Sequence, residues 1–125
     1  MTAADFRKEL VRIMPGYSWT VHRESRLRLP TDVPGEYLDA TGIITAGFNR
    51  LSTLMVIRRE RDGKIEYEVK SAGFGLRSPW LSTCTRPTLA RALRDLQNHY
   101  ESVASNYSSH AFYLRNARQK KEPKS

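Results

Sequence analysis

The chain has 125 residues, of which 39% are hydrophobic, and a formal net charge of +8. This length and apolar content suit one folded domain and exclude an intrinsically disordered chain. No apolar run reaches the ~18 residues of a membrane-spanning helix, and charges interrupt the N-terminal segment, which excludes a secretory signal. We therefore expect a small cytoplasmic protein. The single cysteine, Cys84, excludes an internal disulfide bond.

The first predicted elements are a helix and a strand. Residues 2–14 are predicted to form a helix, because their large apolar side chains recur every three or four positions. Thr2 is a suitable N-cap for this helix. Apolar and polar side chains alternate in residues 17–24, which predicts a strand with one buried face. Residues 25–36 contain two prolines and a glycine, and we expect a loop there.

Three further strands are predicted in residues 37–48, 53–59 and 64–70. The dipeptide Asp62-Gly63 favours a tight hairpin turn between the last two strands, because a type I′ turn needs positive φ at both central positions. Large apolar side chains alternate with charged ones in the last strand. This alternation predicts a sheet with one polar face and one face that packs against other elements.

A long loop is predicted in residues 71–84 and a long helix in residues 87–105. The apolar side chains of this helix recur with steps of four and three, which makes a narrow seam of two positions per heptad. The seam consists of Leu89, Leu93, Leu96, Tyr100 and Val103. Such a seam covers a sheet or, alternatively, pairs two copies of the chain into a dimer. We expect residues 106–109 to end the helix and residues 110–116 to form a helical turn or short strand that docks on the domain.

These elements together predict an α+β fold of order α-β-β-β-β-α. The expected architecture is an antiparallel sheet of about four strands, with the N-terminal and C-terminal helices packed on one face. Residues 1–114 are expected to form this single domain. Residues 115–125 are expected to be a disordered basic tail, because they contain no apolar side chain larger than alanine.

Charge is the strongest functional signal in the sequence, and it is concentrated at the C-terminus. Residues 115–125 hold five basic side chains against one acid, a net of +4 and half of the total. These basic residues are Arg115, Arg118, Lys120, Lys121 and Lys124. Such a segment is typical of an arm that binds phosphates and releases their counterions, and equally of an end that keeps the protein soluble.

Further candidate nucleic-acid contacts are arginines, whose planar guanidinium groups suit phosphates. They are Arg23, Arg26 and Arg28 after the first strand, Arg58, Arg59 and Arg61 before the hairpin, and Arg77 in the long loop. A solvated surface with mixed charges is the alternative interpretation of these clusters. Beside Arg77, the aromatic side chains of Phe74 and Trp80 are candidates for stacking on bases, for anchoring a protein partner, or for covering the edge of the core.

We find no catalytic, cofactor-binding or metal-binding pattern in the sequence. The three histidines lack the spacing of metal ligands, and Cys84 has no activating partner nearby in the chain. We therefore expect a non-enzymatic accessory protein that binds DNA or RNA independently of sequence. The alternative hypothesis is a protein-interaction module that meets an acidic protein or a nucleoprotein. Such a module could inhibit a larger machine, as an anti-defence protein of a phage or mobile element would.

Overall fold

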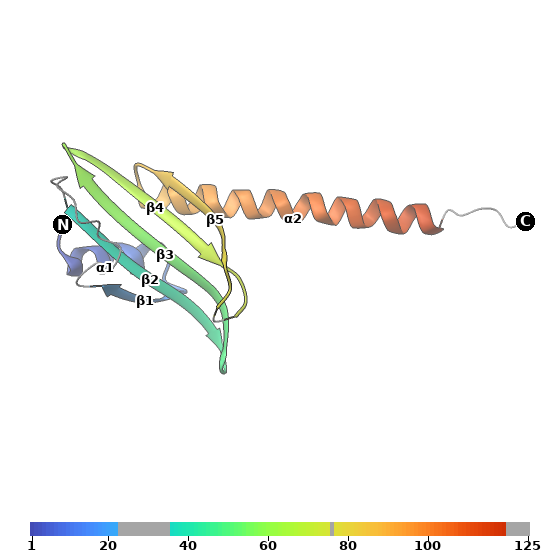
Figure 1. Ribbon diagram of the computed structural model, residues 1–125, viewed down its shortest axis with the longest axis horizontal. Helices are drawn as coiled ribbons and strands as arrows, with labels where there is room; N and C mark the ends of the chain where they lie inside the picture. Colours follow the sequence, from blue (N-terminus) through green and yellow to red (C-terminus); the bar gives the residue numbers. More distant parts are fainter. Residues whose placement is uncertain (23–35, 76, 120–125) are drawn as a thin grey trace, which may run out of the picture.

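The computed structural model describes residues 1–22, 36–75 and 77–119 of the chain. The fold consists of two helices and a five-stranded antiparallel sheet (Figure 1). The elements are α1 (Ala3–Ile13), β1 (Ser18–His22), β2 (Glu36–Ala46), β3 (Asn49–Arg61), β4 (Lys64–Ala72), β5 (Trp80–Arg86) and α2 (Leu89–Gln119). The predicted α+β class is confirmed. The predicted number of strands was one too low, because residues 80–84, which were expected to belong to a loop, form most of strand β5.

The sheet is a meander in which each strand pairs with the next one along the chain, in the order β1-β2-β3-β4-β5. The predicted hairpin between β3 and β4 is confirmed. Asp62 and Gly63 have φ values of 52° and 76°, which are the positive values that the turn requires. From the turn onward β3 and β4 stay in register, from the pair of Arg61 and Lys64 to the pair of Thr53 and Ala72.

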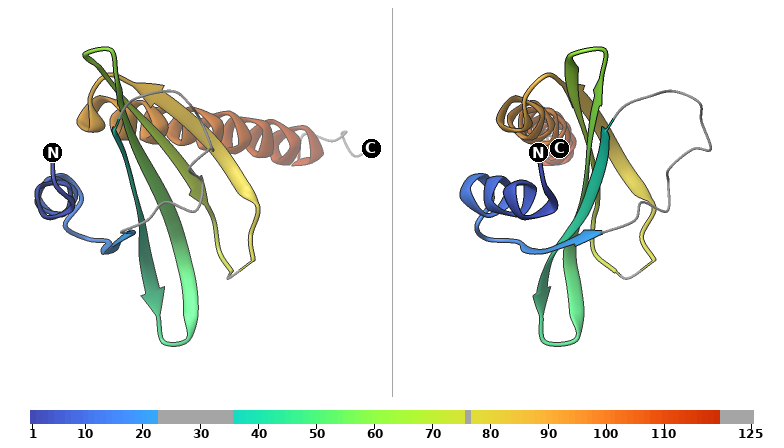
Figure 2. Two further views of the ribbon diagram at one scale, coloured as in Figure 1. Left: turned by 60° about the vertical axis from the view of Figure 1, so that its left-hand side comes forward. Right: turned by 90° about the vertical axis from the view of Figure 1, so that its left-hand side faces the viewer.

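Both helices lie on the same face of the sheet, as the sequence predicted (Figure 2). Helix α1 packs near β1, whereas α2 crosses β4 and β5. The core fills the space between this face and the helices. It includes Phe6 and Leu10 from α1, Leu89, Leu93 and Leu96 from α2, and Trp19, Leu54, Val56, Tyr67 and Val69 from the strands. The opposite face of the sheet carries no described helix.

Helix α1 begins where the sequence predicted, because its N-terminus is closed by a capping box. The backbone N–H of Asp5 donates to Thr2 Oγ1 over 3.1 Å, and the N–H of Thr2 donates to Asp5 Oδ2 over 3.3 Å. This backbone hydrogen bond from Thr2 holds the pKa of the Asp5 carboxyl below its ordinary value. The start of α1 is therefore fixed by local side chains alone.

Trp19 of β1 fixes how closely α1 and β1 approach the rest of the sheet. Its indole Nε1 donates a hydrogen bond of 3.0 Å to the carbonyl of Met14, just after α1. Its ring lies against Gly42, the residue that pairs with it on β2. A Cβ atom at position 42 would lie only 2.7 to 2.9 Å from three ring carbons of Trp19. Glycine is therefore required at position 42 by this close approach.

Helix α2 is longer than the sequence predicted, and its second half projects beyond the sheet (Figure 1). The expected helix end in residues 106–109 was wrong. Those residues contain no glycine or proline, and serine and asparagine lower helix propensity by only about 0.5 kcal/mol each. Residues 110–116 do not dock on the domain, since their side chains are exposed on the projecting helix. Residues 115–119 of the expected tail belong to α2, and residues 120–125 lie outside the described part of the chain.

Candidate functional site

The distal half of α2, residues 101–119, has the most unusual surface in the described part of the chain. Every side chain from Ala104 to Arg118 is exposed. Four of these exposed side chains are large and apolar, namely Tyr107, Phe112, Tyr113 and Leu114, with exposed fractions of 51 to 73%. Solitary exposed apolar residues are common in folded proteins, but several on one projecting helix indicate an interaction surface.

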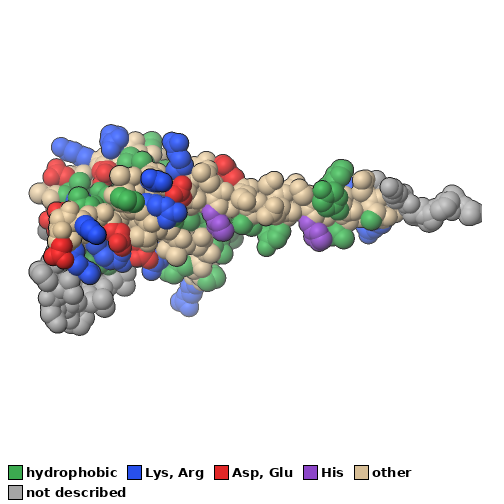
Figure 3. All heavy atoms as spheres, turned by 90° about the horizontal axis from the view of Figure 1, so that it is seen from above, with side chains coloured by type: hydrophobic (Ala, Val, Ile, Leu, Met, Phe, Trp, Pro, Cys, Tyr) green, Lys and Arg blue, Asp and Glu red, His purple; other side chains and the backbone are tan. Residues whose placement is uncertain are grey.

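This distal half also lacks charge. Residues 102–114 contain no Asp, Glu, Lys or Arg, although 27% of the whole chain is charged. Figure 3 shows the same contrast: red and blue charged side chains are scattered over the body, whereas the projecting helix shows green hydrophobic and purple histidine side chains among tan ones, with blue only near its end. An exposed helix normally has a charged face toward water. This stretch of the projecting helix therefore has no charged face.

The exposed apolar side chains continue the seam that packs α2 onto the sheet. From Val103 the steps of four, three and four lead to Tyr107, His110 and Leu114. We call these four residues the distal seam. In the first half of α2 the same seam is buried, with exposed fractions of 1% at Leu89 and 7% at Leu93. One continuous seam is therefore covered by the sheet in its first half and uncovered in its second.

Beyond the seam, the helix is apolar around its circumference at residues 111–114, which we call the apolar tip. Phe112 lies on the side of the helix away from Leu114, because two residues along a helix are about 200° apart. The rings of Phe112 and Tyr113 meet edge to face, with centroids 5.8 Å apart. A helical segment that is apolar on all sides is typical of one enclosed by several walls.

A groove of about 660 Å³ lies between α1 and α2 on the covered face of the sheet. Ile13 and Met14 form one wall at the end of α1, Leu54 of β3 lies on the floor, and Leu93 and Tyr100 of α2 form the other wall. Its volume lies within the ~300–1,000 Å³ of pockets that enclose small ligands or side chains.

Two pairs of hydroxyl groups along the groove are hydrogen-bonded to each other. The hydroxyls of Tyr17 and Ser52 are hydrogen-bonded over 2.7 Å, and those of Ser71 and Tyr100 also share a hydrogen bond. Apolar side chains provide most of the groove surface, and the polar side chains of Arg94, Gln97 and Glu101 also line it. The groove reaches the distal half of α2, since Glu101 and Ala104 are among its lining residues.

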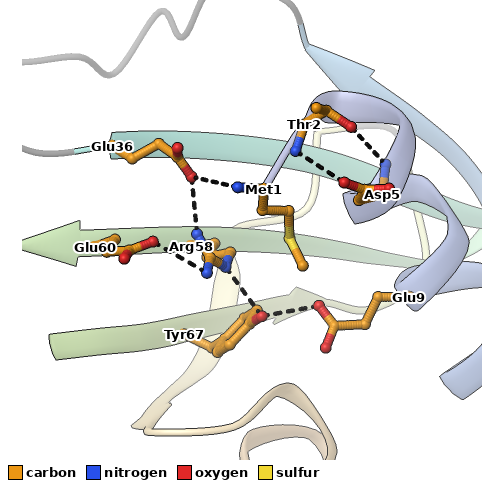
Figure 4. Close-up of polar contacts among 8 residues, drawn as sticks. All are labelled: Met1, Thr2, Asp5, Glu9, Glu36, Arg58, Glu60 and Tyr67. Carbon is orange, nitrogen blue, oxygen red and sulfur yellow. Dashed lines mark hydrogen bonds and ion pairs between the residues drawn. The ribbon is translucent and has the colours of Figure 1, made fainter. Parts of the chain in front are cut away.

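The arginine cluster predicted before the hairpin is divided between the two faces of the sheet. The Arg58 side chain is only 5% exposed and points toward α1 (Figure 4). Its Nε donates to the hydroxyl of Tyr67 over 3.1 Å, Nη1 to Glu36 over 3.0 Å, and Nη2 to Glu60 over 3.3 Å. The hydroxyl of Tyr67 in turn donates to Glu9 of α1 over 2.8 Å. Arg58 therefore joins three strands to α1.

Electrostatics keep Arg58 charged in this position. Burial alone lowers the pKa of its guanidinium, but the hydrogen bonds to Tyr67 and Glu60 outweigh burial and raise the pKa overall. On the opposite face, Arg59 forms ion pairs of 2.6 Å with Glu68 and 3.5 Å with Glu66. Acids of the sheet thus neutralise both arginines, whereas Arg61 at the end of β3 is exposed.

The other predicted contacts are dispersed. Phe74 and Trp80 are 66% and 47% exposed, so neither is enclosed as a cover for the core, and Arg77 is exposed between them. Arg115 and Arg118 lie on the last turns of α2 and are exposed. Six of the predicted basic contacts lie outside the described residues, namely Arg23, Arg26, Arg28, Lys120, Lys121 and Lys124. The described residues thus bring no large group of the predicted arginines together.

Sequence reasoning missed the distal seam and the groove. The signal for the seam was present, because Tyr107, His110 and Leu114 extend the spacing of the earlier leucines without a change of step. The groove had no signal in the sequence, since it depends on the distance at which α1 and α2 cross the sheet.

Comparisons with protein-family models, curated proteins and solved structures found no match to this chain. Among the described residues, no helix combines the length and apolar character needed to cross a bilayer. The same part of the chain holds no cluster of three or more His, Cys, Asp or Glu side chains that could bind a metal ion. The distal half of α2 and the groove are therefore the candidate functional surface.

Proposed function

We propose that this chain is a non-enzymatic protein-interaction module, and that its docking surface consists of the distal half of α2 and the adjoining groove. The observation that carries this proposal is the exposure of four large apolar side chains on a helical stretch without charge. Burying them in a complex removes apolar area from water, at about 25 cal/mol for each Å². A partner therefore gains most of its binding energy at this surface.

The stability of the projecting helix also supports a partner. Isolated helices of fewer than ~12–15 residues are marginal in water, and most helical stability in proteins comes from packing of an apolar face. Residues 102–114 have no oppositely charged pairs to stabilise the helix and contain four serines and an asparagine. A partner that packs on the seam supplies the missing stabilisation. Helices that lie in apolar grooves are a common mode of such recognition.

Photo-crosslinking in cells tests this proposal. A benzoylphenylalanine residue in place of Tyr113 is expected to form a covalent adduct with another polypeptide. The control position is Thr83 of β5, which is exposed on the opposite face of the sheet. The adduct at position 113 should disappear when Leu114→Glu is added, because a charge then interrupts the apolar tip. Equal adducts at positions 113 and 83, or no adduct at 113, would refute the proposal.

A second candidate function is sequence-independent binding of DNA or RNA. It is favoured by the course of α2, which sets Arg115 and Arg118 about one turn apart on the helix, directly before the basic residues of the C-terminus. Each phosphate contact contributes about −0.9 to the slope of log affinity against log salt for duplex DNA. Replacing Arg115 and Arg118 with alanine should thus reduce the slope by about two, measured by fluorescence anisotropy. Arg12→Ala, at an exposed arginine in the last turn of α1 that is not a predicted contact, is the matched control, and salt-independent binding would contradict this function.

A further inference from the structure

We infer that the docking surface binds a second copy of this chain, in an antiparallel dimer in which the apolar tip of each α2 lies at the groove of the other copy. This inference rests on the proposed function, because it names the partner of the same surface. The resulting interface is isologous: each copy supplies the same helix and the same groove, related by a twofold axis.

The spacing of the seam favours pairing of α2 with another helix. Its steps of four and three persist from Leu89 to Leu114, along nearly the whole of α2. Two apolar positions per heptad is the narrow pattern of helices that pair with each other, whereas a helix on a sheet usually needs a wider stripe. The sheet explains the buried half of this pattern. A second α2 helix explains why the pattern continues where the sheet ends.

The distribution of charge also favours a second copy as the partner. Two chains of net charge +8 repel each other over most of their surfaces. The stretch 102–114 is uncharged in both copies, so the distal seams can meet without bringing like charges together. A strongly acidic or basic partner would find no complementary charge on this stretch. A second copy matches it, because its own stretch is equally uncharged.

Charge also selects the antiparallel direction. A parallel pair would place Arg115 and Arg118 of the two copies side by side at the ends of the two helices. In an antiparallel pair these arginines lie at opposite ends of the interface. With Tyr107 opposite His110 at the axis, Arg115 of one copy lies level with Ser102 of the other, next to Glu101. The basic end of each helix thus approaches the acidic side chain of its partner.

The groove receives the apolar tip in this arrangement. The same register sets Leu114 of one copy opposite Val103 of the other, and Tyr113 opposite Ala104. Ala104 and Tyr100 line the groove. The tip is apolar on all sides, so it needs a wall besides the partner helix. The groove supplies this wall from the end of α1.

The area of the interface is sufficient for a stable dimer. A fully buried aromatic side chain removes ~150–250 Å² from water, so Tyr107, Phe112 and Tyr113 each have roughly 100 Å² left to bury. Three such side chains from each copy bury roughly 600 Å² in total, and the surface that they cover adds a similar area, so the interface buries about 1,200 Å². This area reaches the lower end of the ~1,200–2,000 Å² of stable protein interfaces.

Sedimentation equilibrium of the full chain is the first part of the test. We expect a dimer in reversible equilibrium with monomer, and Leu114→Glu should weaken the dimer at least tenfold. The control is Ser105→Glu, which adds the same charge on the side of α2 away from the seam and should leave the dimer unchanged. Both side chains are exposed, so neither change should unfold the domain, which circular dichroism verifies.

Disulfide cross-linking tests the direction of the helices in a background in which Cys84 is replaced by serine. A mixture of the Val103→Cys and Leu114→Cys proteins should form a mixed disulfide faster than either protein alone forms its own. Faster cross-linking of each protein with itself would indicate parallel helices and overturn the inference.

The outcomes separate this inference from the proposed function. A chain that stays monomeric at all concentrations overturns the inference. If the same chain still forms the adduct at position 113 with a different protein, the interaction module stands and only its partner is different. If it forms no adduct at all, both proposals fail.

Discussion

Arg58 and Tyr67 face each other on neighbouring strands, and the guanidinium Nε of Arg58 donates to the hydroxyl of Tyr67 over 3.1 Å. The guanidinium carbon also lies 5.8 Å from the centre of the tyrosine ring, within the range of a cation–π contact. Through Glu9 the pair reaches α1 (Figure 4), and the end of α1 forms one wall of the groove. A residue that looks like a phosphate ligand in the sequence thus holds the groove wall in place.

Replacing Arg58 with methionine should destabilise the fold by about 2 kcal/mol, because a buried charge-assisted hydrogen bond is lost and the hydroxyl of Tyr67 loses its donor. The matched control is Arg59→Met. The Arg59 side chain is 32% exposed, and its ion pairs with Glu66 and Glu68 should contribute less than about 1 kcal/mol. Urea unfolding followed by circular dichroism measures both. Equal losses would contradict a special role for Arg58.

The phenol of Tyr67 should make stability depend on alkaline pH. Burial and the hydrogen bond to Glu9 raise the pKa of Tyr67 above its ordinary value of 10.0 in the folded state. The unfolded state therefore releases the phenol proton first as pH rises. The contribution of Tyr67 is fully present below pH 10 and is lost as pH passes from 10 toward the folded pKa.

The variant Tyr67→Phe isolates this effect. We expect the difference in unfolding free energy between the native chain and the variant to be constant at neutral pH and to shrink above pH 10. Urea titrations at several pH values measure this difference. The native chain and the variant carry the same other tyrosines and lysines, so the effects of these residues cancel in the comparison. A difference that stays constant up to pH 12 would contradict the prediction.

Trp19 and Gly42 provide a test of packing under α1. Gly42→Ala should destabilise the domain by about 1–3 kcal/mol, because the new Cβ atom would lie within 2.9 Å of the indole ring and the ring must move. The control is Gly16→Ala, where nothing lies within 4 Å of the new atom and φ is not positive. It should be neutral or slightly stabilising. Thermal unfolding distinguishes them, and similar melting temperatures would show that the ring shifts freely.

The regular elements with strong local signals could be predicted from the sequence. The capping residues Thr2 and Asp5 and the turn residues Asp62 and Gly63 act within a few positions of the chain, so their effect can be recognised without a fold. Strand β5 could not be separated from a loop in this way. Its pairing with β4 is a long-range contact, and Gly73, Gly75 and Pro79 before it are typical of loops.

The candidate site was predictable only in part. The parity of Leu54 and Val56 indicates that Arg58 points to the same face, but the acids that neutralise it depend on strand register. The heptad spacing was recognisable along α2, yet Asn106 and the serines beside it are weak helix formers that also occur in turns. Local propensity therefore could not decide whether the helix ended there. The continued seam was the better indicator.

Shortening the chain to residues 1–104 should separate folding from association. Residues 105–118, the removed residues whose burial the structure describes, are exposed, so the short chain should have the same unfolding free energy as the monomeric full chain within about 0.5 kcal/mol. Association adds stability that grows with concentration. A hundredfold rise in concentration should stabilise each subunit of the full-length dimer by about 1 kcal/mol, or roughly 3–5 °C in melting temperature.

The short chain should show no such dependence on concentration, and neither should full-length Leu114→Glu, which keeps every other residue of α2. Differential scanning calorimetry at several concentrations measures these shifts. The comparison separates two roles of α2, because Leu89, Leu93 and Leu96 remain packed on the sheet in all three proteins. If the short chain were less stable than the full chain at the lowest concentration, the distal half of α2 would contribute to the fold itself. A melting temperature that still rises with concentration after truncation would place the association surface elsewhere.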